Sequence, residues 1–482
     1  MEINSFFFFS HHTLYNIMQI GGELDYQKQN FSHPQYKMNK ISTQNGTQTA
    51  TISGGGGSQS IFEIPANLVY NLAKSKLYFT MTVPEEQIAG PANGALWIPK
   101  DCASMIAQLQ LYNRAGVYLC DLNYVQNYTK VINKPETSMS EYLQYDTAGI
   151  NAPVAVEAGL SRFLRKSNSV ANSATRTALA PYAKRPTDDS NASINYLEPQ
   201  YAEPGVIYDG AGAGNVAITF CVPLEHFRNS VLACDKDLYF GEPLLLRIVW
   251  SPVNRISWLS SAVNDPDANS EAPDGDVAIS ELNLYLASET NSMIVNALKQ
   301  KVSSGQFSML IPYVHSYKTN LGGANQNISL RFNRQHGERL LKVYSTVFNN
   351  TETTCLAYDN DNTAGAKVTS YYTSLNNNRL QDFNVTVAND EDWLLHMDLV
   401  KNSVIQNVSI YKYNWFHVDD FGGIKLQDTQ GAFNVRTGLP LDIEQKLDVN
   451  YTTAGNNLNH YNFAVTQRVL NIGAVSLNFI HR

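Results

Sequence analysis

The sequence predicts an all-β protein built from two tandem sandwiches, and three observations carry this prediction. A segment opening with Phe62-Glu63-Ile64-Pro65 has a similar counterpart in Phe307-Ser308-Met309-Leu310-Ile311-Pro312, so the two prolines stand 312 − 65 = 247 residues apart. At 482 residues, the chain gives each half enough length for a domain with its own core. Only 16% of the residues are charged, while 27 are Tyr and 29 are Gly. That composition suits sheets, turns and extended loops better than helices.

The first half contains recurrent strand patterns. Apolar residues alternate over 105–112, and the turn Asn113-Arg114-Ala115-Gly116 leads into 117–122, which predicts a hairpin. Further strands are predicted at 76–83, 216–222, 244–250 and 277–286.

A short helix is predicted between the two halves. Asn291 and Ser292 are good N-cap residues, and the helix runs to about Val302. Its apolar residues fall on one face at helical spacing, and Ser303-Ser304-Gly305 ends it.

The second half repeats the pattern of strands separated by long polar loops. Its predicted strands lie at 340–348, 382–387, 404–416 and 468–480. Many short strands with few helices favour jelly-roll sandwiches over α/β folds. We therefore predict two tandem eight-stranded jelly rolls with long surface loops, divided into a flexible N-terminal arm (1–57), a first jelly roll (58–290), a helical linker (291–305) and a second jelly roll (306–482).

The predicted arm differs in composition from the rest of the chain. It contains four consecutive phenylalanines and ends in Gly54-Gly55-Gly56-Gly57, which is a flexible joint. An exposed aromatic patch of this kind needs a partner surface to cover it. The candidate assembly residues are therefore Phe6, Phe7, Phe8 and Phe9. Two long polar segments, 150–215 and 349–370, are expected on the outer surface or between subunits, where their backbone finds water or a neighbour.

Charge and cysteine content exclude several classes of protein. The net charge is −8 and the short basic patch at 162–166 reads as a solvated loop, which argues against sequence-specific nucleic-acid binding. Five cysteines without a C-x-x-C pair favour free thiols, although Cys102 and Cys120 flank the hairpin and leave a bridge open. No run approaches the roughly 20 apolar residues of a membrane span. The N-terminus is a poor signal peptide because Glu2 precedes its apolar run.

No segment carries a catalytic or cofactor motif, so the sequence predicts a protein that is not an enzyme and holds no cofactor or metal. Gly210-Ala211-Gly212-Ala213-Gly214 lacks the spacing of a phosphate-binding loop and reads as a flexible loop. An acidic stretch departs from the calcium-loop pattern and reads as solvated; its residues are Asp265, Asp267, Asn269 and Asp276.

One histidine stands beside acidic residues. His417 precedes Asp419-Asp420, the one place where an acid–base or metal cluster is conceivable. A strand end running into a turn is the plainer interpretation.

The order of these patterns resembles the double jelly-roll major capsid proteins of virophages and polinton-like viruses, and more distantly those of adenoviruses and tectivirus-type phages. The segment 238–250 carries the strongest local match, and residues from 60 to the C-terminus are covered. The other segments that carry the resemblance are 62–77, 104–133 and 370–381.

The resemblance implies a structural protein of the virion, made in the host-cell cytoplasm. In such proteins three copies form a pseudo-hexagonal capsomer, and capsomers tile an icosahedral shell around double-stranded DNA. The implied partners are further copies of the chain, penton proteins and minor capsid proteins, with the DNA enclosed but not read by sequence.

Two other functions are also compatible with the sequence. A minor capsid or spike protein is close in kind, although two full halves suit the main shell component better. A carbohydrate-binding sandwich with exposed aromatic residues is the other, for which Trp97, Trp258 and Trp393 are candidates. Such a protein is normally secreted, which the N-terminus does not favour.

Overall fold

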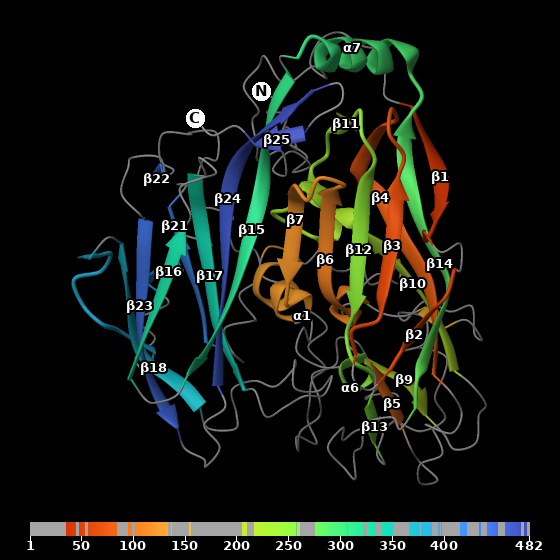
Figure 1. Cartoon of the computed structure of the whole chain (residues 1–482). Coiled ribbons are helices and arrows are strands. Elements are labelled where there is room, and N and C mark those ends of the chain that lie inside the picture. The colour runs from red at the N-terminus through yellow and green to blue at the C-terminus, as the bar shows by residue number, and fades with distance from the viewer. Residues whose placement is uncertain are drawn as a thin grey trace, which may run out of the picture.

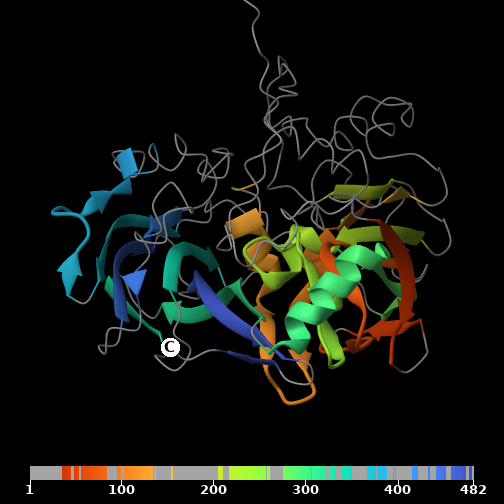
Figure 2. The ribbon, with the colours of Figure 1, turned by 90° about the horizontal axis from the view of Figure 1, so that it is seen from above.

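The computed structural model is dominated by antiparallel strands arranged in two halves that stand side by side (Figures 1 and 2). It describes residues 35–44, 48–53, 56–83, 95–98, 102–133, 136, 154–155, 205–209, 216–256, 258–260, 275–305, 307–321, 325–332, 339–349, 366–375, 377–387, 394–395, 397, 415–421, 433–434, 441–451, 458–473 and 477–479.

The first half contains two main sheets and one small sheet. Its strands are β1 (Tyr36–Ser42), β2 (Ala50–Ile52), β3 (Gln59–Ile64), β4 (Val69–Val83), β5 (Ala95–Ile98), β6 (Ile106–Asn113), β7 (Tyr118–Asn123), β8 (Val154–Ala155), β9 (Gly205–Asp209), β10 (Val216–Pro223), β11 (Asp237–Tyr239), β12 (Leu244–Trp250), β13 (Trp258–Ser260) and β14 (Val277–Glu289). Sheet A has the order β1-β14-β4-β10-β8, with β2 on β14 and β11 on β4. Sheet B has the order β3-β12-β6-β7, and sheet C the order β13-β5-β9.

The second half contains two sheets. Its strands are β15 (Phe307–Leu321), β16 (Asn325–Phe332), β17 (Arg339–Asn349), β18 (Ala366–Leu375), β19 (Asn378–Arg379), β20 (Val385–Thr386), β21 (Phe416–Asp420), β22 (Phe433–Asn434), β23 (Leu441–Tyr451), β24 (Leu458–Ile472) and β25 (Leu477–Phe479). Sheet D has the order β15-β24-β17-β21, with β22 on β17 and β25 on β24. Sheet E has the order β16-β23-β18-β19, with β20 on β18.

The two halves share one strand connectivity, which confirms the predicted pair of jelly rolls. When the eight main strands of each half are ranked along the chain, one sheet reads 1-8-3-6 (β1-β14-β4-β10 and β15-β24-β17-β21). The facing sheet reads 2-7-4-5 in both halves (β3-β12-β6-β7 and β16-β23-β18-β19). Two facing four-stranded antiparallel sheets with these strand orders form a jelly roll.

The predicted N-terminal boundary of the first jelly roll is wrong. Residues 36–42 form its first strand, β1, which pairs along its length with β14, and 50–52 pair with β14 as well. Tyr36 Oη also donates to Asp237 Oδ1 at 2.8 Å. The arm predicted over 1–57 therefore contains two strands of sheet A, and the part before residue 35 lies outside the described residues.

The strand alignment behind the predicted repeat was one strand out of register. The segment ending at Ile64 is the second strand of its half, whereas the segment beginning at Phe307 is the first of its own. The counterpart of Phe307 is therefore Tyr36, a separation of 307 − 36 = 271 residues. The halves are repeated in connectivity, but the pair of Phe-to-Pro segments is a coincidence of local sequence.

Several individual elements follow the prediction. The hairpin of β6 and β7 turns at Gly116, whose φ of +80° suits glycine. Helix α7 (Ser292–Ser303) begins at Asn291, whose side chain accepts from the Met293 amide, and it lies across one end of the first jelly roll (Figure 1). The other helical turns of the described residues are α1 (Val125–Tyr128), α6 (Val253–Ile256), η3 (Cys102–Met105), η4 (Thr129–Asn133), η5 (Leu224–His226) and η6 (Val231–Ala233).

Other elements differ from the prediction. The strand expected over 468–480 is the end of β24, which begins ten residues earlier at Leu458, followed by β25. The expected strand 404–416 is described only from 415 onwards, where β21 begins at Phe416. The two long polar segments contain β8, β9, the last residue of β17 and the start of β18. Their other residues lie outside the described part.

The core of the first jelly roll forms where sheets A and B face each other. The Phe79 ring lies 5.1 Å from Phe220 and 5.1 Å from Trp250, and all three are fully buried. The indole nitrogen of Trp250 donates to Ser60 Oγ at 3.0 Å, so its polar atom is satisfied. Each such side chain contributes about 1.5–3 kcal/mol through burial. The same apolar cluster continues without a break into sheet D of the second half.

Candidate assembly site: the interface between the two jelly rolls

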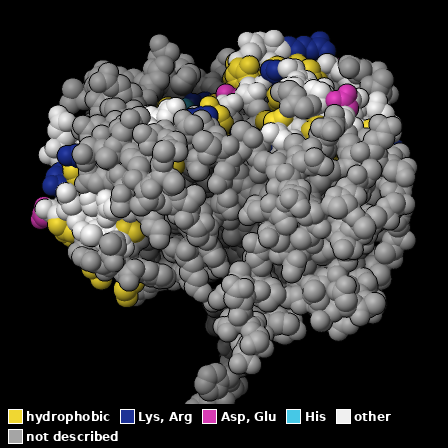
Figure 3. Space-filling view, turned by 90° about the horizontal axis from the view of Figure 1, so that it is seen from below, with side chains coloured by type: hydrophobic (Ala, Val, Ile, Leu, Met, Phe, Trp, Pro, Cys, Tyr) yellow, Lys and Arg dark blue, Asp and Glu magenta, His cyan; other side chains and the backbone are white. Residues whose placement is uncertain are grey.

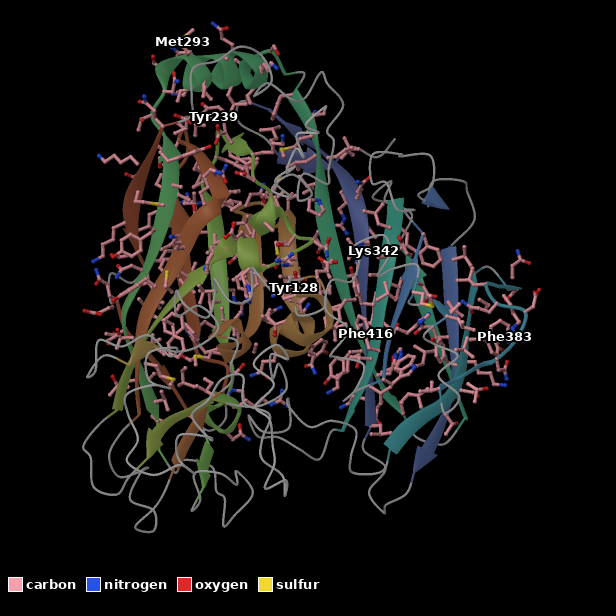
Figure 4. All side chains as sticks on the ribbon, turned by 180° about the vertical axis from the view of Figure 1, so that it is seen from behind. Tyr128, Tyr239, Met293, Lys342, Phe383 and Phe416 are labelled. Carbon is pink, nitrogen blue, oxygen red and sulfur yellow. The ribbon has the colours of Figure 1, made fainter. Side chains whose placement is uncertain are left out.

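The two jelly rolls meet where the segment after the fifth strand of the first half packs on the outer face of sheet D. This segment, Tyr124 to Asn133, contains α1 and η4. Tyr124 adopts a left-handed conformation (φ 56°) that turns the chain out of β7 into α1. Figure 4 labels Tyr128 on this segment and Lys342 and Phe416 on the strands opposite.

Aromatic rings fill the centre of this internal interface. The Tyr128 ring meets Phe463 edge-on at 5.8 Å, and the Tyr124 ring meets Tyr461 at 5.4 Å. Tyr128 and Phe463 are fully buried. Edge-to-face pairs of this kind add about 0.5–1.5 kcal/mol beyond the burial of their area. The interface therefore has the apolar centre of a permanent contact.

A largely buried carboxylate, whose side chain is 14% exposed, lies beside these rings. Glu136 accepts from Tyr344 Oη and from Asn229 Nδ2, and it lies 3.7 Å from Lys342 Nζ. Its backbone carbonyl accepts from the Arg228 guanidinium at 3.1 Å. Groups from both halves thus satisfy a single carboxylate, which fixes the orientation of one half against the other.

The tyrosines of the interface stay protonated. Burial and the Glu136 carboxylate raise the pKa of Tyr344 well above its usual value. Burial also raises the pKa of Tyr461 to about 12. The Tyr344 hydroxyl therefore remains a hydrogen-bond donor to Glu136 at physiological pH.

We expect Glu136→Gln to destabilise the chain by about 1–3 kcal/mol, because the buried Lys342 ammonium loses its opposing charge. Urea unfolding measures this difference. Glu63→Gln is the matched control, because its ion pair with Arg114 is 36% and 64% exposed and is worth about 0–1 kcal/mol. Equal losses in both variants contradict a coupling role for Glu136.

The one histidine predicted beside acidic residues lies in a buried polar layer. His417 and Asp419 are 1% and 4% exposed, and their side chains point from β21 into the space between sheets D and E. β21 ends at Asp420, so these residues lie at the end of a strand, as predicted, and the turn expected after Phe421 lies outside the described residues. His417 Nε2 donates to Asp419 Oδ1 at 2.8 Å, since a carboxylate only accepts. Tyr371 Oη lies 3.0 Å from His417 Nδ1.

This layer continues across both sheets. Asp419 Oδ2 accepts from Thr373 Oγ1 at 3.0 Å and from Gln445 Nε2 at 3.1 Å. Gln445 in turn bonds Ser345, and Asn462 bonds both. Every member is buried. The layer joins the sheets by hydrogen bonds where a jelly roll ordinarily has apolar side chains, and it is enclosed by protein.

A second histidine lies at the edge of the layer. His460 is fully buried, with its ring 5.9 Å from that of Trp415. Burial, opposed by an Asn462 hydrogen bond and aided by His417, lowers the pKa of His460 to about 3. His460 is therefore neutral at physiological pH.

Most residues singled out from the sequence lie elsewhere. Phe6, Phe7, Phe8 and Phe9 lie outside the described residues, as do Trp393, the glycine run at 210–214 and most of the acidic stretch at 265–276. Trp97 and Trp258 stand directly opposite each other across β5 and β13. Cys120 is a buried free thiol.

Two negative findings apply to the described ranges alone. Within them no group of three or more His, Cys, Asp or Glu side chains is placed to hold a metal ion. No helix in the same ranges has the length and apolar character needed to cross a membrane.

Comparisons with known proteins identify the fold. No family model matches the chain, and no curated protein matches its sequence. The Faustovirus major capsid protein matches with a TM-score of 0.53 at 10% identity, covering 92% of this chain and 91% of that one. A chain in the cryo-EM structure of the Sputnik virophage matches with a TM-score of 0.50 at 10% identity, covering 93% and 88%. The chain therefore has the fold of a viral major capsid protein, as the resemblance predicted.

Proposed function

We propose that the chain is a major capsid protein. Three copies form a pseudo-hexagonal capsomer, and capsomers tile an icosahedral shell around double-stranded DNA. The observation that carries the proposal is the pair of jelly rolls with identical connectivity, joined by a buried interface into one block. Three such chains supply six similar units, which is what a six-cornered tile needs.

The physical character of the described part supports a structural role. Glu136 and the aromatic rings between the halves hold them in one orientation, which a tile requires so that its outer contacts stay in register. Within the described part, the His417–Asp419 pair is enclosed, so no substrate reaches it, which favours a structural role for this layer. A net charge of −8 favours enclosing DNA over binding it by sequence.

The remaining elements of the proposal concern location and partners. The protein belongs to the virion and is made in the host-cell cytoplasm. Penton and minor capsid proteins complete the shell, and Phe6, Phe7, Phe8 and Phe9 contact a neighbouring capsomer or a minor protein. A run of four aromatic residues is apolar enough to bury a useful area in such a contact.

We expect the purified chain to be a trimer of about 161 kDa, three times 53.7 kDa. A closed ring leaves no unpaired interface, which favours the trimer over open chains. Light scattering at micromolar protein measures the mass. A monomer or a dimer contradicts the capsid proposal. A monomer that binds glycan arrays through the Trp97 and Trp258 strands supports the carbohydrate-binding alternative instead.

A further inference from the structure

The two halves of the chain have the same strand connectivity, but among the described residues the outer face of sheet D is covered by the other half, whereas the outer face of sheet A is not. In the first half, the segment after the fifth strand, Tyr124 to Asn133, packs on the outer face of sheet D of the second half. Sheet D is the 1-8-3-6 sheet of its jelly roll. The internal contact therefore joins the segment after the fifth strand of one jelly roll to the outer face of the 1-8-3-6 sheet of the next.

The corresponding segment of the second half begins after β19, and its described part presents apolar side chains to solvent. Leu380 is 41% and Phe383 46% exposed, and Leu394 and Met397 are 64% and 60% exposed. Figure 4 labels Phe383 at the end of the molecule remote from the first jelly roll, and Figure 3 shows hydrophobic side chains at that margin. Four large exposed apolar side chains on the described part of this segment indicate a surface that a partner covers.

The corresponding sheet of the first half is sheet A, which lies at the opposite end of the molecule (Figure 2). On its outer face Tyr78 and Tyr285 form an edge-to-face pair at 6.1 Å and are half-buried. Met38, 47% exposed, and the exposed Lys40 and Lys76 surround this pair. On sheet D the same place holds Tyr344, Phe416 and Phe463, which the internal interface buries.

We propose that Leu380, Phe383, Leu394 and Met397 of one copy pack on the outer face of sheet A of a second copy, which repeats the internal contact between chains. This places Phe383 near Tyr78, Tyr285 and Met38, and brings the exposed Asp382 towards Lys40 and Lys76. The contact joins different surfaces of the two copies, so it is heterologous and generates a ring when it closes. This proposed contact rests on the proposed function, which sets the number of copies at three. It adds the identity of the residues that join neighbouring copies.

The first test is a double variant, Leu380→Ser with Phe383→Ser, measured by light scattering. We expect the mass to fall from about 161 kDa to the 53.7 kDa of one chain. Met293→Ser is the matched control, because Met293 is 58% exposed on α7, away from both surfaces, and its variant should remain a trimer. A double variant that stays trimeric at the same concentrations overturns the proposed contact.

The second test covers the case in which the double variant fails to fold. A chain with Phe383→Cys and Met38→Cys is treated with a short bismaleimide, and the linked peptides are sequenced by mass spectrometry. Links from 383 to 38, or from 383 to the native Cys221 on the same sheet, support the contact. Links between two copies of 383 indicate a symmetric contact and overturn it.

These outcomes separate the contact from the proposed function. A wild-type trimer without the expected links leaves the capsid role in place and overturns the contact. A wild-type monomer overturns both.

Discussion

Deletion of residues 1–53 is expected to prevent the first jelly roll from folding, whereas deletion of residues 1–33 leaves every described strand in place. The longer deletion removes β1 and β2, and with them the seven-residue pairing of β1 with β14. It also removes Ile52, a fully buried core residue. Truncating one buried isoleucine costs about 2–5 kcal/mol. Losing a whole strand as well exceeds the roughly 5–15 kcal/mol by which such a domain is stable.

Soluble yield and the cooperativity of thermal unfolding measure the difference between the two deletions. The chain starting at residue 34 is expected to unfold in one transition and to form trimers, while shell assembly is impaired if the phenylalanine run makes its proposed contact. The chain starting at residue 54 should be insoluble or unfold without a cooperative transition. Equal melting temperatures for the two chains contradict the assignment of β1 as a strand of sheet A.

Acidification is expected to destabilise the second jelly roll through His460. Its pKa falls from 6.5 in the unfolded chain to about 3 in the fold, so between these values the unfolded state binds the extra proton. Stability is therefore fully present above pH 6.5 and is lost as the pH falls towards 3. At pH 5 the loss from this one group is about 2 kcal/mol, and at pH 4 about 3 kcal/mol.

Urea unfolding at pH 8, 7 and 5 tests this expectation with the wild type and His460→Gln. Glutamine does not titrate, so the variant should lose about 2 kcal/mol less than the wild type between pH 7 and pH 5. Between pH 8 and pH 7 the two proteins should change alike, which is the internal control. Identical losses in both proteins at pH 5 contradict the burial of a neutral His460.

Elements with strong local signals could be predicted from the sequence. Helix α7 combines a capping Asn291 with apolar residues at helical spacing, and Ile294, Leu298 and Val302 are its buried residues. The hairpin of β6 and β7 has its turn glycine at 116. β12 alternates buried and half-buried residues from Leu244 to Trp250, as a strand with one covered face should.

The first strand could not be predicted, because its sequence lacks this alternation. β1 lies at the edge of sheet A, where lysine and asparagine are tolerated, and its burial is irregular along Tyr36–Ser42. Its place is decided by pairing with β14, from Tyr36 opposite Glu289 to Ser42 opposite Asn283, which are distant in sequence. Without β1, the second strand of the first half falls opposite the first strand of the second half when the two halves are aligned.

The polar layer and the internal interface depend on distant partners in the same way. His417 and Asp419 alternate with Phe416 and Val418, a pattern that normally places the polar face in solvent. Here both faces are buried, because sheet D is covered by sheet E on one side and by the first jelly roll on the other. Glu136 and Tyr344 are 208 residues apart in sequence, and no local pattern links them.

Single-particle cryo-EM of the purified oligomer would show how the chains are arranged. We expect a closed ring of three chains, in which six jelly rolls stand around one axis and each contact between chains repeats the geometry of the contact within a chain. A ring of this kind places Phe383 of each copy against Tyr78 and Tyr285 of the next. A dimer, an open filament or separate monomers in the images contradicts the proposed trimeric capsomer.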